Sequence, residues 1–125
     1  MSDLTLIDPH AALPLSAAVV HNGVAYLSGQ VGFKPGTTEV AGDDVASQAR
    51  QVMANLDEAL AKAGTSKDRI LRCGVYLKDI LGGYAAMNEC YVEWLGDHKP
   101  ARSAIEAPMA RKDILIEIDC IAAVG

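Results

Sequence analysis

Residues 17–31 read Ala-Ala-Val-Val-His-Asn-Gly-Val-Ala-Tyr-Leu-Ser-Gly-Gln-Val, which is two mostly apolar runs joined by Asn22-Gly23. Asn and Gly both accept the positive φ angles of a two-residue hairpin turn, so the stretch predicts antiparallel strands over residues 17–21 and 24–31. Gly29 interrupts the second run, and a glycine inside a strand often marks a bulge or a close approach of another group. The hairpin therefore predicts the beginning of a sheet with an irregularity near Gly29.

An amphipathic helix is predicted after the hairpin, over residues 43–63. Its apolar residues recur at spacings of three and four, which is the pattern of one buried helical stripe. Asp43 and Asp44 favour its N-terminus, and Gly64 follows the last apolar residue as a stop signal. The apolar residues of this stripe are Val45, Ala49, Val52, Met53, Leu56, Leu60 and Ala63.

The remainder of the chain predicts further strands and a second helix. The helix covers residues 84–95, after Gly82-Gly83 and before Gly96, and the strands cover residues 4–7, 69–78, 101–107 and 114–124. The order β-β-β-α-β-α-β-β indicates an α/β (α+β) fold with one mixed six-stranded sheet packed on two helices. Two helices of this length cover only one face of such a sheet, so we expect other subunits to bury the second face.

Composition restricts the classes of partner. The 125 residues are 50% hydrophobic and carry a net charge of −5, which is typical of one folded domain over residues 1–125. An acidic chain without a basic stripe is poorly suited to nucleic acid. No run approaches the ~18 apolar residues of a membrane span, the N-terminal residues 1–4 lack a targeting signal, and the cysteines form no Cys-x-x-Cys motif. We therefore expect a cytoplasmic protein that binds neither nucleic acid nor membranes.

Arg102 is the first candidate for chemistry, because it lies inside the predicted strand over residues 101–107. A strand arginine usually extends to solvent or pairs with an acid, here Glu106 on the same strand face. Alternatively, its planar fork binds a carboxylate ligand through two hydrogen bonds. The spacing alone leaves both interpretations open.

Two acids break an apolar row in the last predicted strand. Glu117 and Asp119 alternate there with Ile116, Ile118 and Cys120. They are either exposed on one face of a sheet edge or partly buried, and a buried acid with a raised pKa suits proton transfer.

Asn88 lies on the apolar stripe of the second predicted helix, as a polar residue at the stripe margin or as a hydrogen-bonding group that faces a cleft. The three histidines lack the spacing of metal ligands, so no metal site is predicted. The sequence also lacks the glycine-rich motifs of nucleotide-binding proteins, and no cofactor is predicted.

Several short motifs together resemble a known family, the reactive-intermediate deaminases, also called the YjgF/YER057c/UK114 family. The resemblance covers about residues 14–124. The motifs are Leu27-Ser28-Gly29-Gln30-Val31, Gln48-Ala49-Arg50-Gln51 with Asn55-Leu56, Val75-Tyr76-Leu77-Lys78-Asp79, Met87-Asn88-Glu89 with Tyr91, Pro100-Ala101-Arg102-Ser103, and Ile116-Glu117-Ile118 with Ile121-Ala122.

This resemblance implies a fold like that of the AroH-type chorismate mutases and a homotrimer with clefts between its subunits. It also implies cofactor-independent hydrolysis of reactive 2-imino or enamine acids to 2-oxo acids and ammonia. In the family pattern, Arg102 grips the substrate carboxylate and Glu117 positions the attacking water. Gly29 and Asn88 are the matching cleft positions.

Two positions depart from the best-known subfamily. Leu15 stands where that subfamily has a tyrosine, and Ala104 stands where it has a cysteine, so the chain resembles a sister branch. The missing cleft hydroxyl and cleft thiol slightly favour a first alternative to the deaminase, and the resemblance leaves three alternatives open in all. They are a non-catalytic module that binds small carboxylates such as 2-oxo acids, an endoribonuclease, and a chorismate mutase.

Overall fold

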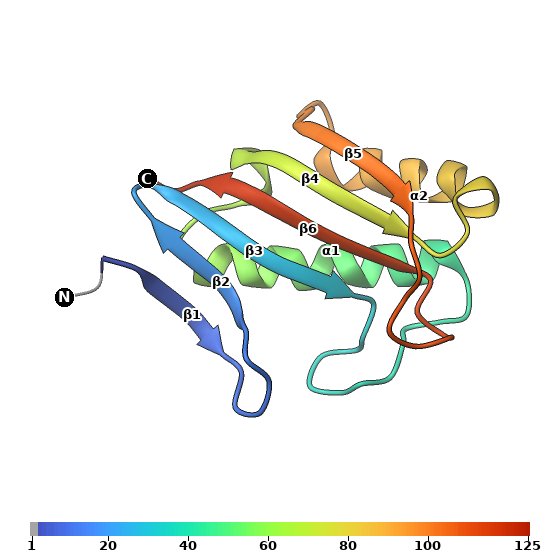
Figure 1. The fold of residues 1–125 in the computed structure, drawn as a ribbon. Coiled ribbons are helices and arrows are strands. Elements are labelled where there is room, and N and C mark those ends of the chain that lie inside the picture. Colours follow the sequence, from blue (N-terminus) through green and yellow to red (C-terminus); the bar gives the residue numbers. More distant parts are fainter. Residues whose placement is uncertain (1–2) are drawn as a thin grey trace.

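The computed structural model describes residues 3–125; the sequence expectations for Met1 and Ser2 lie outside this range. Six strands form one sheet in the order β1-β2-β3-β6-β4-β5, and the predicted mixed sheet on two helices is confirmed (Figure 1). Only β4 and β5 are parallel, joined by a helical crossover. The elements are β1 (Thr5–Pro9), β2 (Ser16–His21), β3 (Val24–Val31), α1 (Val45–Lys62), the 3₁₀ turn η1 (Lys67–Arg69), β4 (Ile70–Leu77), α2 (Ile80–Leu95), β5 (Ala101–Glu106) and β6 (Ile116–Ala123).

The predicted hairpin forms β2 and β3. Asn22 and Gly23 have φ angles of 50° and 76°, the left-handed conformation that this two-residue turn requires. The register between β3 and β6 shifts between Leu27 and Gln30, so the expected irregularity near Gly29 is a β-bulge.

Both helices begin at an aspartate cap. Asp44 Oδ1 accepts a hydrogen bond of 2.7 Å from the Ser47 N–H at the start of α1. Asp79 Oδ1 accepts one of 3.2 Å from the Gly82 N–H, so α2 begins at Ile80.

The prediction that α2 begins at residue 84, after Gly82-Gly83, is therefore wrong. The Asp79 cap offsets the low helix propensity of the two glycines, which lie inside the first turn. Gly83 also has a packing role, because an added Cβ there would lie 3.1 Å from Val45 Cγ2 of α1. Its missing side chain lets the two helices approach each other closely.

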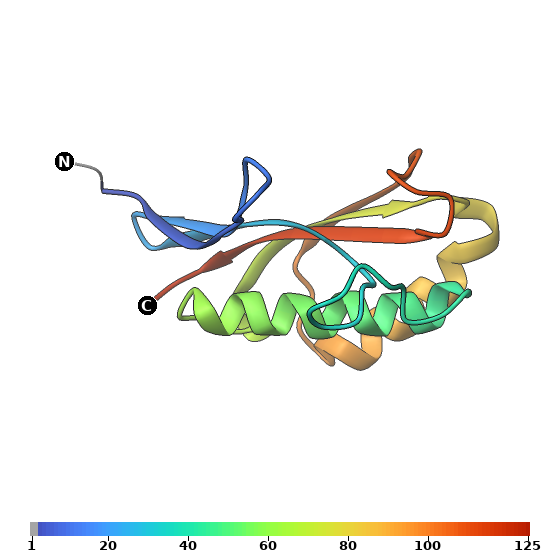
Figure 2. The ribbon, with the colours of Figure 1, turned by 90° about the horizontal axis from the view of Figure 1, so that it is seen from below.

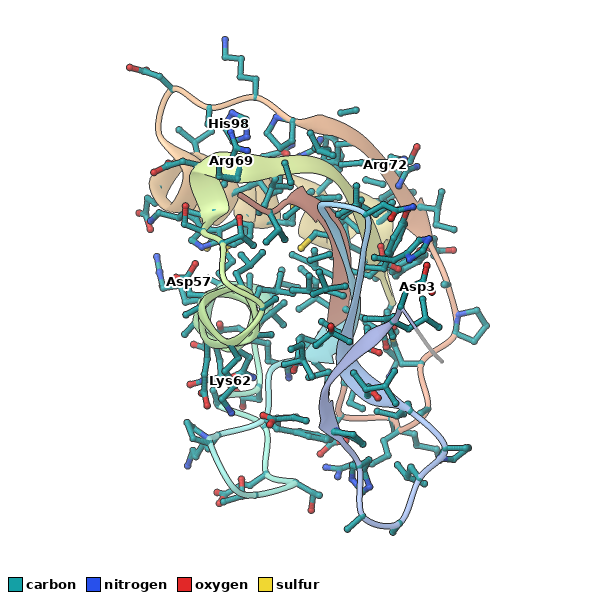
Figure 3. The ribbon with its side chains drawn as sticks, turned by 90° about the vertical axis from the view of Figure 1, so that its left-hand side faces the viewer. Asp3, Asp57, Lys62, Arg69, Arg72 and His98 are labelled. Atoms are coloured by element: carbon teal, nitrogen blue, oxygen red, sulfur yellow. The ribbon has the colours of Figure 1, made fainter. Side chains whose placement is uncertain are left out.

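Figure 2 shows both helices on the same side of the sheet, which we call the helix face; the other side is the open face. Figure 3 views the sheet along its edge, with Asp57 of α1 on one side and Arg72 of β4 on the other. Along β6 the residues alternate between these faces. Ile116, Ile118, Cys120 and Ala122 are buried on the helix face, whereas the side chains between them are only partly buried.

The open face carries large apolar side chains that no helix covers. Tyr26 of β3 and Ile105 of β5 are 49% and 52% exposed, and the register places both on this face. The chain described here thus leaves the second face of the sheet uncovered, as expected. Its burial by other subunits stays a prediction. No helix within residues 3–125 combines the length and apolar character needed to cross a membrane.

Gln48 of α1 is fully buried and joins two loops to the core. Its Nε2 donates hydrogen bonds of 2.8 Å to the backbone oxygens of Gly42 and Asp113, and its Oε1 accepts one of 2.8 Å from the Leu115 N–H. These contacts fix the residues that precede α1 and those that precede β6. One side chain therefore helps to position β6, the strand that pairs with both β3 and β4.

Replacement of Gln48 by Leu should lower the free energy of unfolding by about 2–4 kcal/mol, because it leaves three partly buried backbone groups without their side-chain partner. Urea denaturation measures the change. Gln51→Leu on the same helix is the matched control, because Gln51 donates only to the Asn55 side chain, and it should cost less than about 1 kcal/mol. Equal losses in the two variants would contradict this role of Gln48.

Candidate active site

Arg102 lies on β5, at one edge of the sheet, and its side chain points to the helix face. Its register partner on β4 is Cys73, which is buried against the helices. From there the guanidinium reaches α2. Nη1 donates to Asn88 Oδ1 at 2.7 Å, and Nη2 donates to the Tyr84 hydroxyl at 3.1 Å. The Tyr91 ring lies 4.9 Å from the guanidinium carbon. We call Arg102, Tyr84, Asn88 and Tyr91 the Arg102 cluster.

The guanidinium of Arg102 has no acidic partner within residues 3–125. Glu106, the partner considered from the sequence, instead accepts a hydrogen bond of 3.1 Å from the Ile80 N–H. Aromatic faces and an amide oxygen hold a cation in place without neutralising it. The cluster can therefore still bind an anion.

A cavity of about 430 Å³ opens beside Arg102. Its walls come from the end of α2, including Tyr91 and Val92, and from the loop over residues 96–100. Burial raises the pKa of the Tyr91 hydroxyl, with the Cys73 thiol beside it adding to the effect. Tyr91 thus remains a neutral wall of the cavity. The cavity has room for a small carboxylate close to the guanidinium.

Glu117 lies on β6, on the open face. Gly29 of the β3 bulge is its neighbour, and an added Cβ at Gly29 would overlap the Glu117 carboxylate. Burial raises the pKa of Glu117, and the negative charge of Asp119 raises it further. No hydrogen-bond donor from residues 3–125 contacts its carboxylate. We call Glu117 and Gly29 the Glu117 face. The Glu117 carboxylate is suited to accept a proton.

The sheet separates these two groups of residues. Arg102 is on the helix face of β5 and Glu117 is on the open face of β6, with β4 between the two strands. Two strand spacings alone amount to about 10 Å. The structure thus brings Arg102 together with Asn88 and Glu117 together with Gly29. It does not bring Arg102 and Glu117 together within one chain.

The two departures from the family pattern are also apart. Leu15 is 48% exposed in the loop between β1 and β2, where His10 Nδ1 accepts hydrogen bonds from the Ala12 and Leu13 N–H groups. Ala104 is partly buried on β5, two residues beyond Arg102. Four strand spacings, about 19 Å, separate β2 from β5.

Sequence reasoning missed two members of the Arg102 cluster. Neither Tyr84 nor Tyr91 was predicted as a site residue, yet both surround the guanidinium. Their spacing of seven residues, with Asn88 between them, places all three on one helix face, which is the signal that could have identified them. Within residues 3–125, no three His, Cys, Asp or Glu side chains gather as metal ligands would.

The raised pKa of Glu117 predicts how stability changes with pH. The folded chain binds this proton more tightly than the unfolded chain, whose pKa is near the ordinary value of 4.5, so ionising Glu117 destabilises the fold as the pH rises above 4.5. Glu117→Gln removes this effect. Its free energy of unfolding relative to the wild type should therefore increase from pH 4 to pH 7 in urea titrations. A pH-independent difference would mean that another group stabilises the carboxylate in the folded protein.

Comparison with known proteins places the chain in a family. The family model described as Endoribonuclease L-PSP matches residues 5–124. A RutC family protein of Pyrococcus horikoshii is 40% identical over 109 residues, which cover 87% of this chain and 86% of that protein. The mitochondrial protein mmf1 of Schizosaccharomyces pombe is 39% identical over 115 residues, which cover 90% of this chain and 69% of that protein.

A solved structure shows the same arrangement of strands and helices. It is a putative endoribonuclease L-PSP from Entamoeba histolytica, with a TM-score of 0.88 and 37% sequence identity, covering 97% of this chain and 99% of that one. The family model, the sequence relatives and this structure agree over nearly the whole chain. The chain therefore belongs to the YjgF/UK114-type family of RutC-like (Rid) proteins.

Proposed function

We propose that this protein is a cofactor-independent hydrolase of the 2-iminobutanoate/2-iminopropanoate deaminase type, which converts reactive 2-imino and enamine acids to 2-oxo acids and ammonia. One observation carries the proposal. The guanidinium of Arg102 is held by an amide oxygen and two aromatic rings, borders a cavity, and has no acidic partner among the described residues. Such a group is suited to bind the carboxylate of a small substrate.

The proposed reaction uses only this chain's own residues and water. Arg102 binds the substrate carboxylate and fixes the electrophilic imine carbon near one water molecule, a mainly entropic gain. Glu117 takes a proton from that water as its oxygen bonds to the carbon. That proton passes to the imine nitrogen and gives a tetrahedral carbinolamine. A second proton then moves from the new hydroxyl, through Glu117, to the nitrogen, so the C–N bond breaks and ammonia leaves as the C=O bond forms. Asn88 orients Arg102, and Gly29 leaves room for the Glu117 carboxylate.

The two acting residues must come from different chains, since the sheet separates them within one chain. We infer a homotrimer in which the Glu117 face of one chain packs against the Arg102 cluster of the next. The exposed Tyr26 and Ile105 on the open face support burial against other copies. Leu15 and Ala104, which lie at opposite edges of one chain, would line the same cleft in such an assembly.

Other functions remain as outcomes of the tests. A module that only binds small carboxylates would use the same Arg102 cluster without turnover. The endoribonuclease suggested by the family model's name needs contacts to many phosphates, which a net charge of −5 disfavours.

We also propose a cytoplasmic location, supported by three free and buried cysteines. One relative is named a mitochondrial protein, so cell fractionation tests the location.

Arg102→Ala should lower kcat/KM for imine hydrolysis about 30- to 5,000-fold, since a charge-assisted contact to a carboxylate contributes roughly 2–5 kcal/mol. An amino-acid oxidase supplies fresh imines from a panel of amino acids, and their disappearance is followed with and without the protein. The control is Arg69→Ala, which removes an exposed arginine of η1 and should leave the rate unchanged. Wild-type turnover by Arg102→Ala would contradict the role of Arg102.

Subunit mixing tests whether the site is shared. Neither Arg102→Ala nor Glu117→Gln should be active alone, but oligomers assembled from equal amounts of both should regain about one quarter of wild-type activity, because one interface in four combines an intact Arg102 with an intact Glu117. Light scattering should show trimers throughout. Inactive mixtures, or a stable monomer with full activity, would show that one chain supplies both residues.

A further inference from the structure

The mechanism above does not use Tyr76 or Asp119, although both lie beside Glu117 on the open face. Tyr76 of β4 is the register partner of Glu117 on β6, and Gly74 is the register partner of Asp119. Directly opposed side chains normally contact each other across an antiparallel pair. The Tyr76 hydroxyl instead reaches along the diagonal and donates a hydrogen bond of 3.0 Å to Asp119 Oδ2. The donor nearest to Glu117 in the pairing is thus bound to a different carboxylate.

Gly74 makes this diagonal contact possible. An added Cβ at position 74 would lie 2.6 Å from Asp119 Oδ1 and 2.9 Å from the Tyr76 hydroxyl oxygen. Any other residue at this position would occupy the space in which the hydroxyl and the carboxylate meet. The glycine therefore allows Tyr76 to turn away from its register partner.

The other neighbours of Glu117 supply no competing charge. On the β3 side, Gly29 has no side chain and Val31 is apolar. Arg72, the nearest arginine along β4, donates to Ser103 Oγ at 3.0 Å and to the Cys73 backbone oxygen at 3.3 Å (it is labelled on the open side in Figure 3). Lys78, which directly follows β4, donates from Nζ to the Lys112 backbone oxygen. Tyr76 and Asp119 are thus the titratable groups beside Glu117 within the β4–β6 pair.

We propose that Asp119 is a positioning residue for Glu117. It accepts the hydrogen bond of the Tyr76 hydroxyl in the space that Gly74 leaves open, and so keeps that donor away from the Glu117 carboxylate. Asp119 also places a negative charge beside the Glu117 carboxylate. The proposal rests on the proposed function in so far as Glu117 transfers a proton. Its consequence is a carboxylate with high proton affinity and open access, as a general base requires. The charge of Asp119 acts in that direction on the pKa of Glu117, after burial.

The test separates the charge of Asp119 from its hydrogen bond. Asp119→Asn removes the charge but keeps an oxygen that Tyr76 can donate to. Asp119→Ala also frees the Tyr76 hydroxyl to turn to Glu117. The double variant Asp119→Ala with Tyr76→Phe removes that donor again. Carbon-13 NMR follows the titration of the Glu117 carboxyl, assigned by its loss in Glu117→Gln. The pH profile of kcat/KM is recorded in parallel.

The midpoint of the Glu117 titration should fall by about 0.5 to 1 pH unit in Asp119→Asn, the size expected for a charge about 7 Å away in partly solvated surroundings. It should fall further in Asp119→Ala and return to the Asp119→Asn value in the double variant. The acidic limb of kcat/KM should follow the same order. Asp68→Asn removes an exposed acid of η1 as the control for net charge and should change neither curve.

An unchanged midpoint in Asp119→Asn would overturn the electrostatic role. Equal midpoints in Asp119→Ala and in the double variant would overturn the claim that Asp119 holds Tyr76 away. Asp119→Asn preserves the size and the hydrogen bond, so it decides the charge even where alanine unfolds the chain. The NMR titration needs no activity; the expected order without imine hydrolysis would refute the proposed function and leave this proposal intact.

Discussion

Residues alternate between two faces along every strand of this sheet, and helices pack on only one of those faces. A polar side chain in the middle of the helix face would have to find a buried partner, and along β6 that face is apolar throughout. The cation of the candidate site is therefore at an edge strand, where Arg102 reaches from beneath α2 to the cavity. The acids of β6 are on the other face. Arg102 and Glu117 therefore lie on opposite faces of the sheet and do not meet within one chain.

Glycines determine where carboxylates fit on the open face. Gly29 on β3 and Gly74 on β4 flank β6, and each leaves a space that an acid of β6 enters. A glycine in a strand loses packing and conformational entropy, so two such positions beside two acids weaken the sheet locally. The bulge at Gly29 and the diagonal Tyr76–Asp119 bond use this space. The sheet is thus locally less stable at Gly29 and Gly74, the positions that make room for the carboxylates of Glu117 and Asp119.

Much of the fold could be predicted from local patterns, and the site could be predicted only in part. Asn22-Gly23 was enough to predict where β2 ends and where β3 begins, because few other dipeptides adopt those φ angles. The start of α2 was missed, because a cap and a close helix contact outweighed the low propensity of Gly82-Gly83. The surroundings of Arg102 depend on how α2 lies over β5, which no short-range pattern contains. That Arg102 and Glu117 face opposite ways follows only from the register of β4 with both neighbours.

The proposed division of the site between chains has an electrostatic consequence. In a single chain, water reaches both the Arg102 cluster and the Glu117 face, and it weakens the attraction for a carboxylate as well as the proton affinity of the base. Packing one against the other would remove water from both at once. The guanidinium would then bind an anion more strongly, and the base would hold its proton more tightly. In the proposed trimer, assembly and chemistry are therefore linked: association completes the set of residues and creates the dry surroundings in which they act.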